Sequence, residues 1–589
     1  MFDSLRRALR DYAHEILRAF HLLSSRRKLL FVTFLALFVL SSTGLIWKVN
    51  ELFSVEVPAY AGSLAEGIVG VPRFINPLLA TSDADEDLTA LVYSGLMRAT
   101  GNGTYLPDLA EGYVASADNL TYTFTLREGL TWHDGKAVTA SDVVFTIKKA
   151  QDPSLKSPKR ANWEGVAVEA TDDRHVTFTL KQPYALFLEN ATMGILPSHI
   201  WGELDTDAFT YSTKNAEPIG SGPYKLARTE KNDSGIPTVA HLESFRKFAL
   251  GRPYIQGLDM HFYPNEEALM LARERGEVEM IATLTPATAR SLEAKGIAVH
   301  TSEGPLPRTF GVFWNQNSAR VFTDATVRKA LEIAVDKNAF VKTVLDGYAL
   351  PLDGPLPRGS FGYSETQAAE TGIAAAKSVL EKGGWQFDET KKVYTKTTTV
   401  KSGGKQTKET TELSFSLSTS DAPELKASAE FLASAWQQVG ARVALHIYEI
   451  GDLNQNVIRT RKYDALLFGE IIGRNPDLFA FWHSSQRQDP GLGIALYANS
   501  TTDSILEKAR EESDPEKRRA LLADFQEEIR KDSPALFLYA PSFIYSAPDR
   551  LKGMNLAALG TPSDRYTDSY EWYVETDRVW RWFAPDRTE

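Results

Sequence analysis

The sequence of 589 residues contains no cysteine. This absence excludes disulfide bonds, thiolate metal sites, a cysteine nucleophile and a lipid anchor on an N-terminal cysteine. It is consistent with an extracytoplasmic protein that avoids stray oxidation. Basic residues are also in deficit, since 65 Lys and Arg face 76 Asp and Glu and give a net charge of −11. We therefore expect no nucleic acid partner.

The chain also lacks the local motifs of common enzymes. No Gly-x-Ser-x-Gly occurs, and the ten histidines show neither HxxxH nor HExxH spacing. The run Gly403-Gly404-Lys405 lacks the first glycine and the terminal Ser or Thr of a P-loop. His133 and Asp134 are neighbours in a predicted turn, which favours a structural role over an acid–base pair. The sequence thus predicts no enzyme, no catalytic residue, no metal site and no cofactor.

Long hydrophobic runs are scarce, and the clearest is the uncharged stretch Leu29–Trp47. At a rise of 1.5 Å per residue its nineteen residues span about 28 Å, close to the roughly 30 Å hydrocarbon core of a bilayer. Basic residues are dense before this stretch and sparse after it, so the positive-inside rule places residues 1–28 in the cytoplasm and the chain after about residue 50 outside. We predict a transmembrane segment at 29–47.

Two questions about this N-terminus stay open. Ala59-Tyr60-Ala61 has the small-x-small form of a signal peptidase site, but it lies some dozen residues past the apolar run. We favour an uncleaved signal anchor over a cleaved signal peptide. The leader has helical spacing of apolar residues, which predicts either a membrane-surface amphipathic helix or simply a basic topogenic tail. These apolar residues are Leu5, Leu9, Ile16, Leu17 and Phe20.

The most informative stretch of the outer chain is Leu120–Ile147. Thr and apolar residues alternate from Thr121 to Leu126, which predicts a half-buried strand. His133-Asp134-Gly135 predicts a tight turn. Thr139, followed three residues later by an acidic residue, predicts a helix N-cap.

This stretch carries a family resemblance. The run TFTLREGLTWHDGKAVTASDVVFT resembles the signature of the family 5 extracellular solute-binding proteins, the dipeptide- and oligopeptide-binding proteins of ABC importers. Further runs in the family's order are Pro107–Tyr113, Pro218–Leu226, Leu271–Ile281 and Asp324–Asp336. The resemblance covers about residues 64–555.

The resemblance implies an α/β fold of the two-lobed periplasmic-binding-protein type, closing on a ligand by a hinge motion. We expect a linker at 48–62, lobe I at 63–308 with an extra subdomain at about 103–215, lobe II at 309–540, and a return to lobe I at 541–589. We expect a helix from about Asp85 to Met97, with the C-terminal residues on the outside of lobe I. Residues 391–412 predict a hairpin or a solvated excursion.

The ligand-contacting residues follow only from the resemblance. It implies the cleft turn Thr81-Ser82, for which an ordinary capping turn is an equal explanation, and Trp314 and Asn315 on the crossing strand. It also implies Thr419 and Ser420 in a loop of lobe II. Trp482 is a further candidate, although its neighbour His483 is better explained as a structural histidine.

One segment departs from the family pattern. Ile472 stands where relatives carry an Asp that binds the peptide ammonium, so the ligand either lacks a free amine there or meets a substitute. Glu470, two residues earlier, points the same way on a strand and is that substitute candidate. Arg474 offers a positive group for an anion or carboxylate, or is a surface residue.

The expected function is therefore a membrane-anchored, monomeric solute-binding protein of an ABC importer. It captures oligopeptides or a related polar solute and delivers them to a permease, with a separate ATPase subunit as the motor. The alternatives are a transport-independent ligand sensor or envelope scaffold, and a secreted hydrolase.

Overall fold

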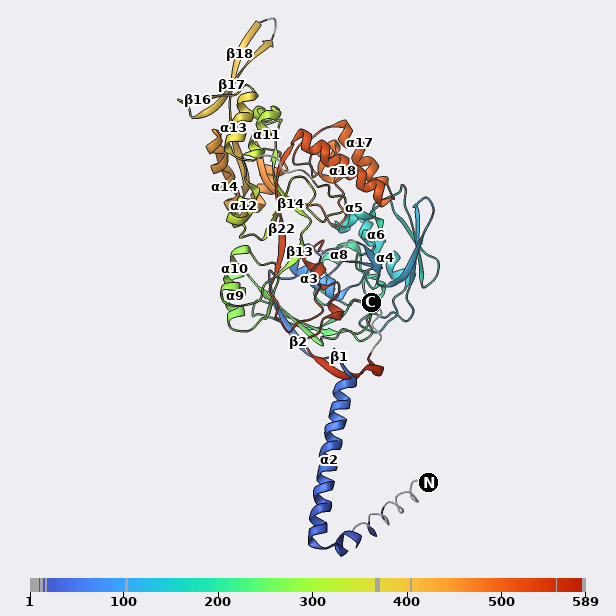
Figure 1. Ribbon diagram of the computed structural model, residues 1–589. Helices are drawn as coiled ribbons and strands as arrows, with labels where there is room; N and C mark the ends of the chain where they lie inside the picture. Colours follow the sequence, from blue (N-terminus) through green and yellow to red (C-terminus); the bar gives the residue numbers. More distant parts are fainter. Residues whose placement is uncertain are drawn as a thin grey trace. The chain divides into compact units, whose positions relative to one another are not determined.

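The computed structural model describes residues 10, 14–15, 18–100, 104–365, 371–402, 405–557 and 559–584. The chain divides into two compact units (Figure 1). One contains Met1–Ala59 and Val574–Glu589, and the other contains Tyr60–Tyr573.

The first unit is built on the long helix α2 (Ser25–Phe53). Within the described residues, α2 is the one helix that is long and apolar enough to cross a membrane. It is followed directly by strand β1 (Ser54–Pro58), which pairs antiparallel with β23 (Thr576–Trp580). The end of the chain therefore returns to the end of the helix.

The second unit begins with the central sheet of lobe I, in the order β12-β2-β11-β10-β9. Its strands are β2 (Ser63–Val69), β9 (Tyr224–Lys231), β10 (Pro237–Ser244), β11 (Gly257–Tyr263) and β12 (Met280–Ile281). Strand β2 runs parallel to both its neighbours, and β10 runs antiparallel to both of its own. The helices beside this sheet are α3 (Asp83–Val92), α9 (Glu266–Glu274) and α10 (Pro286–Ala294).

A second, antiparallel sheet of lobe I has the order β5-β6-β8-β7. Its strands are β5 (Ala110–Ala115), β6 (Thr121–Leu126), β7 (Ala167–Ala170) and β8 (His175–Thr179). The short ribbon β3 (Met97–Ala99) with β4 (Tyr105–Pro107) precedes it. The helices around this sheet are α4 (Ala140–Gln151), α5 (Arg160–Trp163), α6 (Phe187–Asn190), α7 (Ser198–Trp201) and α8 (Thr206–Tyr211). Aromatic rings, among them Phe124, Trp163 and Phe178, fill its core.

Lobe II is organised by a sheet in the order β13-β22-β14-β21-β19-β20, with β15 added beside β22. Its strands are β13 (His300–Pro305), β14 (Arg308–Trp314), β15 (Ala349–Pro351), β19 (Ser414–Ser420), β20 (Arg442–Tyr448), β21 (Ala465–Ile471) and β22 (Ala535–Tyr545). Strand β22 pairs with β14 through residues 535–539. Just beyond β22, Ser546 pairs with Ile281 of β12. This strand therefore links the two lobes.

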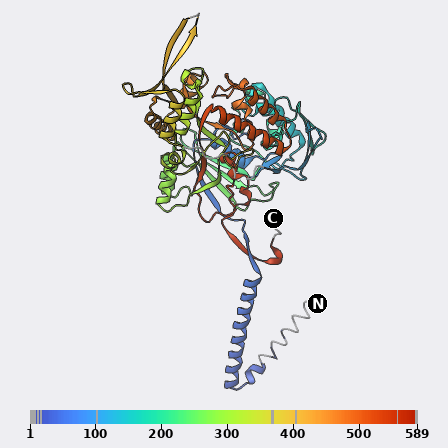
Figure 2. The same ribbon diagram turned by 45° about the horizontal axis from the view of Figure 1, so that its top comes forward.

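Helices cover both faces of the lobe II sheet (Figures 1 and 2), and each face has its own apolar core. The helices of one face are α11 (Ala325–Ile333), α12 (Lys337–Val344), α13 (Ile373–Lys382) and α14 (Pro423–Val439), and those of the other are α16 (Phe479–Trp482), α17 (Ser500–Glu511) and α18 (Pro515–Asp532). A hairpin of β17 (Val393–Ser402) and β18 (Lys405–Glu412), with β16 (Gln386–Asp388) at its base, extends away from this lobe.

The predicted strand, turn and capped helix of Leu120–Ile147 are confirmed. In β6 the side chains alternate between half-buried and buried. The turn closes through a hydrogen bond from the Gly135 N–H to the Trp132 carbonyl. Asp142 accepts a hydrogen bond from the Thr139 N–H at 2.8 Å, as in a capping box. The His133 ring contacts the backbone carbonyl of Gly222, which gives it a structural role.

The expected helix from about Asp85 to Met97 was too long at its C-terminal end, because α3 ends at Val92. The Gly222 N–H donates to the Val92 carbonyl, and a Cβ on Gly220 would lie 2.0 Å from that carbonyl oxygen. Another part of the chain thus occupies the space that a longer helix would need. Met97 lies in β3 instead.

The expectation that the C-terminal residues lie on the outside of lobe I also needs correction. Tyr566 and Trp572 are buried inside lobe I rather than placed on its outside. Residues from Val574 onward group with the N-terminal helix, because β23 pairs with β1. The other predicted lobe boundaries stay predictions.

For residues 391–412 the sequence predicted either a hairpin or a solvated excursion, and the hairpin is confirmed. Gly403 and Gly404 at its tip lie outside the described residues. So do Leu5, Leu9, Ile16 and Leu17 of the leader, and its predicted amphipathic face stays a prediction.

Candidate functional site

A cavity of about 350 Å³ lies between the two lobes. Lobe I supplies most of its wall, from α3, from residues 159–163 and 189–194, and from residues 560–564. Lobe II supplies Ile471, Gly473 and Arg474. A second cavity, of about 440 Å³, is lined by residues 303–307 and 358–363 and also by Arg474. The side chain of Arg474 therefore helps to separate the two spaces.

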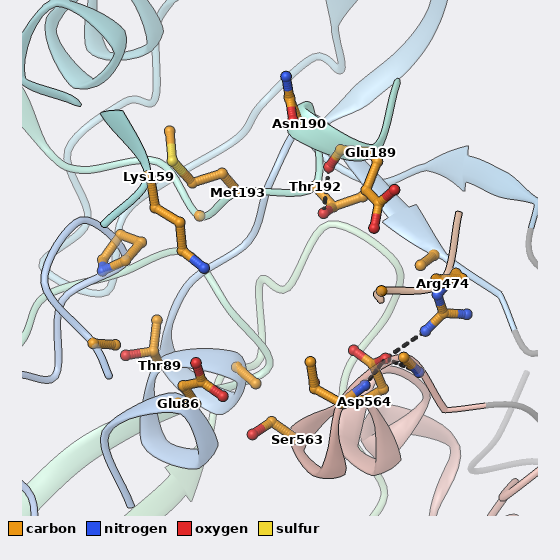
Figure 3. A pocket seen from close by; sticks show the side chains of 18 of the residues that line it. Glu86, Thr89, Lys159, Glu189, Asn190, Thr192, Met193, Arg474, Ser563 and Asp564 are labelled. Atoms are coloured by element: carbon orange, nitrogen blue, oxygen red, sulfur yellow. Dashed lines mark hydrogen bonds and ion pairs between the residues drawn. The ribbon is translucent and has the colours of Figure 1, made fainter. Parts of the chain in front are cut away.

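Arg474 bridges the lobes. Gly473 has φ +74, a left-handed conformation that turns the chain just after β21 and that glycine adopts without strain. The Arg474 guanidinium donates to an Asp564 carboxylate oxygen at 2.5 Å (Figure 3) and to the Thr100 carbonyl. Asp564 is itself fixed, because it accepts hydrogen bonds from the backbone N–H groups of Gly560 and Thr561. The ion pair therefore joins a guanidinium of lobe II to a carboxylate that backbone N–H groups hold in position.

A second polar contact crosses the lobes beside this bridge. Asn475 of lobe II donates to the Tyr105 hydroxyl of lobe I at 2.8 Å. The Tyr105 hydroxyl in turn interacts with Glu189, which stands at the end of α6. Burial raises the pKa of Glu189 to about 7, although Arg474 and the Tyr105 hydrogen bond act to lower it. This carboxyl therefore changes its charge close to neutral pH.

The cavity carries charges of both signs. In Figure 3, Lys159, Glu86 and Glu189 from lobe I extend towards one space, with Arg474 and Asp564 at its edge. Burial raises the pKa of Glu86, and the nearby Lys159 acts to lower it. The site can therefore pair with both an ammonium and a carboxylate of one solute.

Only Arg474 among the ten predicted contact residues lines one of these two cavities in the described part of the chain. Thr81 and Ser82 are exposed, and Ser82 caps α3 by accepting a hydrogen bond from Asp85. The other seven are buried: Trp314, Asn315, Thr419, Ser420, Glu470, Ile472 and Trp482. Thr419, for example, donates to the Leu467 carbonyl, and Asn315 donates to the Arg461 carbonyl. Direct contact of these residues with a solute stays a prediction.

The segment that departs from the family pattern is oriented by the alternation of β21. Ile471 faces the cavity, so Glu470 and Ile472 point to the opposite side of the strand. Ile472 belongs to the apolar core under α17 and α18. Burial raises the pKa of Glu470 well above its ordinary value, and the neighbouring Trp482 only partly offsets this. Because burial disfavours its charged form, Glu470 is poorly suited to pair with an ammonium group.

Four charged groups of the cavity were missed by sequence reasoning: Glu86, Lys159, Glu189 and Asp564. They come from four distant segments, and none stands in a recognisable motif. Glu189 offered the best signal, since it follows the apolar run Ala185–Leu188 and a charge beside such a run is often held near a core.

The chain is similar to known solute-binding proteins. The model of bacterial extracellular solute-binding proteins, family 5, matches residues 104–491. The oligopeptide-binding protein AppA of Bacillus subtilis is 26% identical over an alignment of 517 residues that covers 84% of this chain and 89% of AppA. The dipeptide-binding protein of Escherichia coli is 25% identical, over 83% of this chain and 91% of its own length.

Solved structures agree. AppA of Bacillus subtilis in complex with a nonapeptide has a TM-score of 0.68 and 25% identity, covering 88% of this chain and all of that one. The substrate-binding protein CtaP of Listeria monocytogenes has a TM-score of 0.74 and 26% identity with the same coverage. The family match spans more than half of the chain, and the two-lobed fold predicted from the sequence is the fold of these proteins. The chain belongs to the family 5 extracellular solute-binding proteins.

Proposed function

We propose that this protein is the substrate-binding component of an ABC importer, and that it takes a short peptide or a similar zwitterionic solute into the cavity between its lobes. The observation that carries the proposal is a cavity with charges of both signs whose wall comes from both lobes. A solute held there contacts both lobes at once, so its binding favours the closed arrangement. The names of the relatives AppA and the dipeptide-binding protein support a peptide ligand.

The charges suggest how a zwitterion would be oriented. Glu189 and Asp564 lie at the Arg474 end of the cavity, and Lys159 lies near Glu86. An ammonium group beside Glu189 would favour the ionised carboxylate, and a carboxylate would pair with Lys159. A cavity of about 350 Å³ is at the small end for ligand pockets, which favours a dipeptide or tripeptide over a long peptide.

We further propose that α2 is an uncleaved anchor and that the unit Tyr60–Tyr573 works outside the cytoplasm. The length and apolar character of α2 support this, as does the excess of basic residues before it. No turnover of the solute is expected, and the chain works as a monomer beside a permease and an ATPase. A cleaved leader would give a mature chain that begins after Ala61.

The test uses the full chain in lipid nanodiscs. Isothermal titration with dipeptides and tripeptides, singly and as mixtures, should detect saturable binding without product formation. Glu189→Gln and Lys159→Gln should each weaken binding of a zwitterionic peptide, whereas Glu274→Gln on the exposed surface of α9 should leave it unchanged. Absence of binding by peptides of every length from two to nine residues would contradict the proposed ligand class. The N-terminal sequence of the purified protein decides between anchor and signal peptide.

A further inference from the structure

The last described residues of the chain form an aromatic cluster on the end of α2. The Trp580 indole donates to the Asn50 side chain at 2.7 Å. The Trp582 ring stacks on Phe53 with 5.4 Å between ring centroids, and the Trp580 and Trp582 rings are 5.9 Å apart. We call Phe53, Trp580, Trp582 and Phe583 the aromatic collar. The three contacts just described lie within the unit that holds α2.

The helix sets the level of this collar relative to a bilayer. The uncharged run of α2 ends at Trp47. Asn50 and Phe53 are three and six residues further on, about 4.5 and 9 Å at 1.5 Å per residue. The headgroup region adds roughly 5–8 Å on each side of the hydrocarbon core. When α2 spans the membrane, Trp580, held at Asn50, therefore lies at headgroup depth, and Trp582, stacked on Phe53, lies at the outer edge of that layer.

The collar also exposes large apolar side chains, whose contact with water is unfavourable. Trp582 is 69% and Phe583 79% exposed, and they are consecutive in the chain. Exposed clusters of large apolar side chains mark interaction surfaces. Tryptophan favours the membrane interface, where its ring is shielded and its N–H stays in a polar layer. Arg581, between the two tryptophans, brings a guanidinium suited to lipid phosphates.

We propose that Trp580–Phe583 lies in the lipid headgroup region of the outer leaflet and holds the C-terminal end of the chain on the membrane. The proposal rests on α2 being a membrane span, as put forward above. The unit Tyr60–Tyr573 is joined to the first unit by two chain connections, Ala59–Tyr60 and Tyr573–Val574. Both connections would then start from the bilayer surface, so the solute-binding unit is tethered by two strands of chain rather than one.

The test exploits the absence of cysteine, because a single introduced thiol can be labelled without background. Three single-cysteine chains carry a nitrobenzoxadiazole fluorophore in nanodiscs: Ala584→Cys beside the collar, Leu37→Cys in the middle of α2, and Thr576→Cys at the other end of β23. Each is measured with a nitroxide quencher on the lipid headgroup or deep in the acyl chain. Ala584→Cys is measured again with Trp580→Ala and Trp582→Ala added, and circular dichroism checks that the chain stays folded.

The proposal predicts that the headgroup nitroxide quenches the label at 584 severalfold more than the label at 576, and that the deep nitroxide quenches the label at 37. The two Trp→Ala changes should reduce quenching at 584 to the level seen at 576. A quenched label at 37 with an unquenched one at 584 would overturn the collar while the anchor stands. An unquenched label at 37 would overturn both. Unchanged quenching after the two Trp→Ala changes would show that the aromatic rings do not hold the segment.

Discussion

Arg474 is the residue on which the proposed closed state most depends. Its guanidinium contacts Asp564 and the Thr100 carbonyl across the lobes, and its side chain is only 10% exposed. Charge-assisted hydrogen bonds that are shielded from water contribute about 1.5–3 kcal/mol. The contacts of this one side chain therefore shift the equilibrium between the open and closed arrangements towards the closed one.

Arg474→Ala should weaken solute binding. Loss of about 1.5–3 kcal/mol from the closed state corresponds to a roughly 10- to 100-fold rise in the apparent dissociation constant. Arg290→Ala is the matched control, since Arg290 makes an exposed ion pair with Asp346 and neither residue lines the two cavities. Titration calorimetry on both variants measures the effect. Equal affinity of the two variants would show that Arg474 does not stabilise the closed state.

Glu189 makes stability depend on pH. Burial raises the pKa of Glu189 from 4.5 to about 7, so between these values the folded chain holds a proton that the unfolded chain has lost. The stability that this proton gives is fully present below pH 4.5 and is lost as the pH rises through about 7. Glu189→Gln should remove this part of the decline. Thermal melting of both proteins from pH 4 to 8 should show curves that diverge through this window, and parallel curves would be inconsistent with the raised pKa.

The individual residues of the site were harder to predict from the sequence than the fold was. Arg474 was identified because a family pattern drew attention to its segment. Glu189 and Lys159 were not, since their proximity depends on how α6 and residues 159–163 pack. Glu470 and Ile472 were expected to point the same way, but the sequence alone did not reveal which face of β21 (Ala465–Ile471) meets the cleft.

Among the elements, the junction between α3 and the loop Pro218–Tyr224 shows how glycine permits close packing. A Cβ at Gly220 would lie 2.0 Å from the Val92 carbonyl oxygen, and one at Gly222 would lie 2.6 Å from the Val92 carbonyl carbon. A side chain at either position would therefore prevent this close packing. The same contact ends α3, which local periodicity could not reveal.

Gly220→Ala should destabilise the protein, because the added methyl group collides with rigid backbone. Overpacking of this kind costs about 1–3 kcal/mol. Gly112→Ala is the control, since no atom lies within 4 Å of a Cβ built there. Chemical denaturation of both variants gives the comparison, and equal midpoints would show that the loop moves away without cost.

The whole outer chain is held together by contacts between its beginning and its end. Arg565 donates to Glu66 at 2.8 Å and to Asp87 at 2.6 Å, and all three side chains are almost fully buried. The Tyr566 hydroxyl donates to Glu66 at 2.7 Å. The sequence predicted the return of the chain to lobe I but not this network, because no local pattern shows which buried charges will pair.

Arg565→Met should strongly destabilise the protein, since it leaves two buried carboxylates without their cation. Removal of one partner from a buried ion pair costs about 3–5 kcal/mol. Arg550→Met removes an exposed pair with Glu279 and should cost at most about 1 kcal/mol. Differential scanning calorimetry compares the two. A melting temperature of Arg565→Met as high as that of Arg550→Met would mean that the network adds little.

Closure of the two lobes on a solute can be tested directly by measuring a distance between them. Ala117→Cys in lobe I and Ala374→Cys on α13 of lobe II introduce two exposed thiols into a chain that has none, and spin labels on them can be measured by double electron–electron resonance. With a bound peptide, closure of the lobes should give one narrow distribution of short distances. Without peptide, an added population should appear at longer distance, and Arg474→Ala should enlarge that population. If calorimetry shows that peptide binds while the distance distribution stays unchanged, the lobes do not close on the solute.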